Sequence, residues 1–192
     1  MIALTAALLL SMQGAPAGQS GSEDVDLLPK PAAPDPQAVA RQQELERQLQ
    51  SRRKMLQLHQ VGGMLTLASL GATVIFGQLN YNDKYGGGGD TGQWYNWHKY
   101  TALTAAAVFA ATGALAVFAP SPLEKPSRLD TAMLHKISMG VATAGMVTQI
   151  ALGFVTASKS GSTSQRDLAL AHQIVGYTTF AATAVGFGVL TF

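Results

Sequence analysis

Four long stretches of the sequence contain no Asp, Glu, Lys or Arg, and they limit the possible fold more than any other feature. The stretches have 28, 24, 22 and 25 residues and cover residues 55–82, 100–123, 137–158 and 168–192. A helix of about 20 apolar residues crosses the roughly 30 Å hydrocarbon core of a bilayer. The stretches are rich in Ala, Gly, Thr and Ser, and small residues of this kind let membrane helices pack closely.

The sequence therefore predicts an all-α membrane protein in contact with lipid. Short loops between the stretches predict an up-down-up-down four-helix transmembrane bundle, which forms a domain at residues 57–192. A cluster of Trp and Tyr at residues 94–100 predicts an aromatic belt at one membrane interface. The predicted spans lie at about 57–80, 95–119, 131–157 and 168–191.

The first 56 residues differ from the rest in composition. Residues 1–17 combine a short apolar core with small residues at a cleavage-like site, which predicts a signal peptide; a short membrane-associated helix is the alternative. Residues 18–36 contain four prolines and four acidic residues, which predicts a disordered linker. Residues 37–56 are rich in helix formers and charges, which predicts a charged helix. We consider residues 18–56 the segment through which a protein partner would dock.

Composition excludes several classes of function. The chain has no cysteine, so it has no disulfide, iron–sulfur cluster or thiolate metal site, and no haem attached through a C-x-x-C-H motif. A net charge of +2 does not favour binding to nucleic acid. The tetraglycine at residues 86–89 is not followed by Gly-Lys-Ser/Thr, which argues for a flexible turn rather than a phosphate-binding loop.

The chain has four histidines, one near the N-terminal end of each predicted span. They are spaced by 39, 37 and 37 residues, as His59, His98, His135 and His172. Such side chains are costly within a membrane, so they are candidates for a functional role. If consecutive spans alternate in direction, the first and third histidines lie on one side of the membrane, and the second and fourth lie on the other.

In a square bundle these two pairs lie on the diagonals, so the imidazoles of each pair can face one another across the core. A planar macrocycle between them would give a six-coordinate, bis-histidine iron. The sequence therefore predicts two b haems, with His59, His135, His98 and His172 as the metal ligands. For a single histidine a structural role would be the better interpretation; the joint pattern favours ligation.

Residues near the histidines agree with this prediction. The positions four residues after them, on the same helical face, are Gly63, Ala102, Met139 and Gly176. The two glycines, Gly63 and Gly176, would leave room for a porphyrin. Lys99 and Lys136 directly follow two histidines and would bind haem propionates; ordinary snorkelling lysines are the alternative.

The pattern resembles the cytochrome b561 superfamily over residues 55–192. The resemblance rests on one histidine per core helix and on the segments LHKISMGVATAGMVTQIALGF and LALAHQIVGYTTFAATAVGFG. It implies that His59 and His135 share one b haem and that His98 and His172 share the other. The chain lacks the additional helix that typical eukaryotic members carry on each side of the core, and it lacks a basic motif of the ascorbate-binding type.

Two sequence signals conflict over orientation. A cleaved signal peptide would place residue 18, and with it the His59 side, outside the cytoplasm. The positive-inside rule favours the reverse, because six basic residues flank the membrane on that side and four flank it on the other. We follow the signal peptide, which predicts a protein of a bacterial inner membrane with a periplasmic N-terminus.

The leading functional hypothesis is a trans-membrane electron conduit, in which single electrons move between two haems, one per leaflet. Neither its donor nor its acceptor follows from the sequence, nor does a terminal enzymatic reaction. A non-redox membrane scaffold or accessory subunit is the second hypothesis. A proton or metal-ion transporter with a histidine relay is the third, and the lack of a carboxylate in the middle of any span argues against it.

Overall fold

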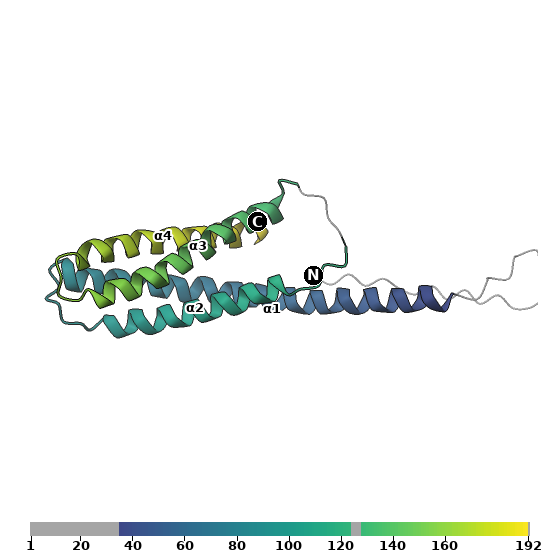
Figure 1. Ribbon diagram of the computed structural model, residues 1–192, viewed down its shortest axis with the longest axis horizontal. Coiled ribbons are helices and arrows are strands. Elements are labelled where there is room, and N and C mark those ends of the chain that lie inside the picture. Colours follow the sequence, from purple (N-terminus) through teal and green to yellow (C-terminus); the bar gives the residue numbers. More distant parts are fainter. Residues whose placement is uncertain (1–34, 124–127, 192) are drawn as a thin grey trace, which may run out of the picture. The chain divides into compact units, whose positions relative to one another are not determined.

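The protein was analysed as a computed structural model, which describes residues 35–123 and 128–191. The predicted signal peptide at 1–17 and all but the last two residues of the predicted linker at 18–36 lie outside the described residues. The described residues form four α-helices: α1 (Pro36–Tyr85), α2 (Tyr95–Val117), α3 (Thr131–Ser158) and α4 (Gln165–Thr191) (Figure 1). The described part of the chain contains no strand.

The four helices are each long and apolar enough to cross a membrane. This confirms the all-α fold and indicates an integral membrane protein. Large apolar side chains lie exposed along all four helices; Ile75 and Phe154, for example, are 60% and 71% exposed. An outer surface of this kind suits a lipid environment better than water.

The charged segment and the first span form one continuous helix of 50 residues. Pro36, the last residue of the predicted linker, is the first residue of α1, a position that tolerates proline because the first turn has no backbone acceptor for its amide. The N-terminal part of α1 extends beyond the other helices (Figure 1). Arg52 joins this part to the segment that follows α2, because its guanidinium donates to the Pro120 carbonyl oxygen at 2.6 Å and to the Ser121 hydroxyl at 2.9 Å.

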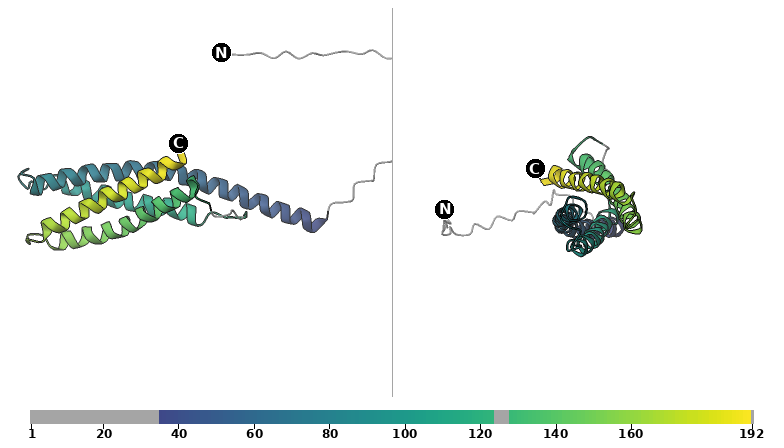
Figure 2. Two further views of the ribbon diagram at one scale, coloured as in Figure 1. Left: turned by 90° about the horizontal axis from the view of Figure 1, so that it is seen from above. Right: turned by 90° about the vertical axis from the view of Figure 1, so that its left-hand side faces the viewer.

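The helices pack as two hairpins, α1 with α2 and α3 with α4, which contact each other mainly through α1 and α4 (Figures 1 and 2). Within each hairpin the two helices run in opposite directions. Thr66 in α1 donates to Thr112, near the end of α2, whereas Phe76, farther along α1, stacks on Trp94 and Trp97 at the start of α2. Gly145 of α3 lies directly against Thr179 of α4.

The buried apolar core is a small cluster at the middle of the bundle. Leu70 of α1, Ala105 of α2 and Met146 of α3 are its buried members. Phe109 of α2 and Phe180 of α4 pack against them, so all four helices contribute a side chain. This cluster separates the two ends of the bundle.

The loop between α1 and α2 is held by a buried carboxylate. Asp83, beyond the predicted first span, accepts hydrogen bonds from the Thr91 amide and hydroxyl and from the Gly92 amide, at 3.2, 3.0 and 2.9 Å. Burial opposes its ionisation, but these hydrogen bonds together hold the pKa of Asp83 below its ordinary value. Gly92 and the loop glycines Gly87 and Gly89 have φ values of +72°, +89° and +91°, a left-handed conformation that favours glycine. The tetraglycine therefore forms part of the turn between α1 and α2.

Candidate functional site: two pairs of histidines

The structure brings the four histidines together as two pairs. The imidazole of His59 on α1 faces that of His135 on α3, with ring centres 6.0 Å apart and ring planes at 84°. The imidazole of His98 on α2 faces that of His172 on α4, with ring centres 5.9 Å apart and the same angle. These are the two diagonal pairs that the sequence predicts, although ligation of a metal stays a prediction.

The two pairs lie at different levels of the bundle. His59 forms a hydrogen bond with the backbone of Thr112, near the end of α2. His98 forms one with the backbone of Thr73 in α1. The 14 residues from His59 to Thr73 correspond to about 21 Å along a helix that rises 1.5 Å per residue. The apolar cluster around Leu70 lies between these levels.

Three of the four imidazoles are oriented by a backbone carbonyl. Nδ1 of His59 lies 2.8 Å from the Thr112 oxygen, Nδ1 of His98 lies 3.1 Å from the Thr73 oxygen, and Nδ1 of His135 lies 2.7 Å from the Gly186 oxygen. A carbonyl oxygen only accepts, so each Nδ1 carries the proton and the lone pair of a neutral ring is on Nε2. This is the arrangement of a histidine that binds metal through Nε2.

His172 differs from the other three histidines. The Gln149 backbone approaches its Nδ1, but this buried nitrogen has no partner at hydrogen-bond distance among the described residues. Unpaired buried donors are rare in folded proteins because their desolvation is not compensated.

Glycines bring two of the histidines close to the neighbouring helix. A Cβ atom at Gly77 would lie 2.9 Å from Cε1 of His98, and one at Gly153 would lie 3.4 Å from Cε1 of His172. A larger residue at Gly77 would therefore push the imidazole away from α1. The requirement for glycine at these two positions was not predicted from the sequence, which gives no sign of which glycine faces which histidine.

The spacing within each pair fits a six-coordinate iron porphyrin. Two metal–nitrogen bonds of about 2.0 Å, each followed by about 1.1 Å from nitrogen to ring centre, give a separation of roughly 6 Å. A porphyrin supplies four ligands itself and needs only two from the protein. Among the described residues no cluster of three or more His, Cys, Asp or Glu side chains is placed to hold a metal ion, so the donor set at each site is a pair of imidazoles.

The other predicted cofactor-binding residues lie at the surface or at contacts between helices. Lys99 and Lys136 are exposed, and the Lys99 ammonium lies 6.0 Å from the centre of the Tyr100 ring. A Cβ atom at Gly63 would contact Phe187 at 3.8 Å, and one at Gly176 would meet the Gln149 side chain. Gly63 therefore lies at the contact of α1 with α4, and Gly176 lies at the contact of α3 with α4.

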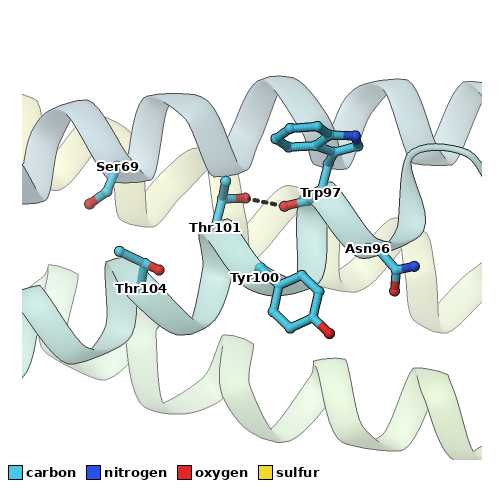
Figure 3. Close-up of a pocket in the computed structure, with 6 residues that line it drawn as sticks. All are labelled: Ser69, Asn96, Trp97, Tyr100, Thr101 and Thr104. Carbon is cyan, nitrogen blue, oxygen red and sulfur yellow. Dashed lines mark hydrogen bonds between the residues drawn. The ribbon is translucent and has the colours of Figure 1, made fainter.

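A surface groove of about 340 Å³ lies beside the start of α2, and none of the histidines lines it. Figure 3 shows Ser69 of α1 opposite the α2 residues Trp97, Tyr100, Thr101 and Thr104. Trp97 and Tyr100 are 60% and 63% exposed, as residues of a membrane-interface belt are. The groove is therefore a feature of the outer surface, separate from the histidine pairs.

Comparisons of this chain with protein-family models, with curated proteins and with solved structures gave no match.

Proposed function

We propose that the chain is a di-haem b-type cytochrome, similar to the cytochrome b561 superfamily, that moves single electrons across a membrane. The observation that carries the proposal is the presence of two imidazole pairs, each with ring centres about 6 Å apart, at two levels of a bundle of apolar helices. In this proposal the four helices cross the membrane in an up-down-up-down order. One histidine pair then lies in each leaflet.

The protein's part in this function is to bind and orient. Bound haem iron would supply reversible one-electron chemistry. Nε2 of each histidine is the ligand atom, and the carbonyls of Thr112, Thr73 and Gly186 fix the tautomer and ring direction of three of them. Lys99 and Lys136 are exposed beside two ligands and would pair with propionates.

The middle of the bundle keeps the two sites apart and dry. Leu70, Ala105 and Met146 are buried there, with Phe109 and Phe180 packed against them. An apolar layer of this kind excludes water and ions, so charge would cross it as an electron and not as an ion. One-electron donor and acceptor molecules would act at opposite faces, and the N-terminus would be periplasmic.

The spectrum of the purified protein tests the proposal. Protein isolated from haem-sufficient cells is expected to give a b-type signal in its dithionite-reduced minus oxidised spectrum, with two haems per chain. Absence of a b-type signal would refute the proposal. Reporter fusions at residues 25 and 162 would determine the orientation.

An accessory role is the second candidate, and it is favoured by the N-terminal part of α1. Leu45 and Leu49 there are 38% and 39% exposed, although charged residues surround them in the sequence. Leu45 and Leu49 are four residues apart and so lie on the same face of the helix, where they form a small apolar stripe that a protein partner would cover. In this role the protein would anchor a larger complex and would contain no haem.

A further inference from the structure

The two hairpins repeat the same contacts around their histidines. A shift of 76 residues takes His59 of α1 to His135 of α3, and takes Gly77 to Gly153. A shift of 74 residues takes His98 of α2 to His172 of α4, and takes Thr112 to Gly186. Thr112 and Gly186 supply the carbonyls that bind His59 and His135, and both glycines lie against a histidine ring. The repeat therefore includes ligands, orienting carbonyls and close glycines.

Among the contacts of the histidines, the repeat fails beside His172. The same shifts take Thr73 to Gln149 and Ala102 to Gly176. The Thr73 carbonyl oxygen lies 3.1 Å from Nδ1 of His98, whereas Nδ1 of His172 has no hydrogen-bond partner among the described residues. The Gln149 backbone approaches His172 as the repeat requires, but the contact falls short of hydrogen-bond geometry.

The Gln149 side chain distinguishes this contact from the one at Thr73. Its Nε2 lies only 2.5 Å from the place a Cβ atom would occupy at Gly176, so the amide fills the space that a side chain at Gly176 would need. The imidazole of His172 also lies farther from its neighbouring glycine than that of His98, at 3.4 Å against 2.9 Å from the ideal Cβ position. The longer side chain of Gln149 therefore occurs at the same contact where His172 lies farther from the neighbouring helix.

We propose that Gln149 is a positioning residue that weakens the backbone hydrogen bond to His172, so that the haem bound by His98 and His172 has the more positive reduction potential of the two. This inference rests on the proposed function. A hydrogen bond from Nδ1 to a carbonyl makes the imidazole a stronger donor and favours ferric iron. His59 and His135 both have that bond, whereas in the other pair His98 has it and the contact of His172 with the Gln149 backbone falls short of hydrogen-bond geometry.

Redox titration of the purified holoprotein tests the inference. A His59→Ala/His135→Ala background leaves only the haem of His98 and His172, so its midpoint potential is measured alone. In that background, the double variant Gln149→Thr/Gly176→Ala gives the contact of α3 and α4 the residues that the repeat has at the contact of α1 and α2. We expect the midpoint potential to shift to a more negative value. Val147→Thr, at a position of α3 that is 65% exposed, is the matched control and should leave the potential unchanged.

The reverse exchange provides a second, independent measurement. Thr73→Gln/Ala102→Gly copies the contact of α3 and α4 onto α1 and α2, and should shift the same potential to a more positive value. An unchanged potential in both exchanges, with haem bound, would overturn the role of Gln149. So would finding that the haem of His98 and His172 has the more negative potential in the unmodified protein. Absence of haem from every variant and from the parent protein would instead refute the proposed function.

Discussion

The two helical hairpins are alike in where they place their two histidines and different in how closely they hold one of them. Each places one histidine against a glycine of its partner helix, Gly77 for His98 and Gly153 for His172. In the α1–α2 hairpin both histidines have a carbonyl partner within 3.1 Å, whereas in the α3–α4 hairpin only His135 has one among the described residues. The comparison shows that the histidines can keep the same positions in both hairpins while one orienting contact becomes weaker.

Among the changes predicted here, removal of haem should have the largest effect on the stability of the protein. Each histidine pair takes one member from each hairpin, so a bound haem would join two hairpins that otherwise contact mainly through α1 and α4. A ligand at 1,000 times its dissociation constant stabilises the folded state by about 4 kcal/mol. We expect apoprotein to unfold at a lower temperature and to be cleaved faster by protease at 118–130. Equal melting temperatures with and without haem would contradict this expectation.

Substitution at the two histidine-facing glycines should have unequal effects. Gly77→Ala brings a methyl group to 2.9 Å from the His98 ring, which must move, and overpacking of this kind costs about 1–3 kcal/mol. Gly153→Ala brings it to 3.4 Å from the His172 ring, so its effect should be smaller. Thermal unfolding and haem content measure both changes. Gly113→Ala is the control, because nothing lies within 4 Å of its Cβ position.

If Gly153→Ala were as harmful as Gly77→Ala, the looser packing at His172 would be refuted. An effect of Gly113→Ala equal to that of Gly77→Ala would show that the loss comes from the helix itself and not from the contact with His98.

The loops of the two hairpins should differ in their response to acid. Of the changes predicted here, this one should have the smallest effect on stability. Asp83 holds the first loop as a carboxylate, whereas the neutral Gln165 holds the second by accepting from the Gly161 amide and donating to the Thr156 carbonyl. Because the folded-state pKa of Asp83 is lowered, its contribution is complete above the unfolded value of about 3.9 and is lost as the pH falls through the lowered pKa.

Fluorescence of Trp94 and Trp97, which follow the first loop, would report this change. The signal should change in strongly acidic solution in the parent protein, and Asp83→Asn should give the changed signal already at neutral pH. Gln165→Ala should leave the acid transition of the first loop in place. A transition that persists in Asp83→Asn would assign it to another group.

Most of the fold could be predicted from the sequence because the length of an uncharged, apolar stretch largely decides whether it forms a membrane-spanning helix. The uncharged stretches located the four helices to within a few residues, apart from the N-terminal extension of α1; the predicted span at 168–191, for example, lies in a helix of Gln165–Thr191. The partners of the histidines followed from the alternating direction of the helices. These features depend on patterns along the chain, which a sequence displays directly.

The contacts that orient the histidines could not be predicted, because they depend on helix rotation and register. In the sequence, residues 59–63 (HQVGG) are similar to residues 172–176 (HQIVG), which suggests that the first and last helices correspond. The contacts repeat from α1 to α3 and from α2 to α4 instead. Backbone carbonyls such as those of Thr112 and Gly186 leave no mark in a sequence, since every residue has one.

Haem content of paired histidine variants tests the central claim most directly. The variant His59→Ala/His135→Ala removes both ligands of one pair and should retain one haem per chain. The variant His59→Ala/His98→Ala removes one ligand from each pair and should retain no bis-histidine haem. The haem-to-protein ratio, with the low-spin spectrum as a check, measures both. The opposite result, one haem kept by the second variant and none by the first, would contradict the pairing on which the account rests.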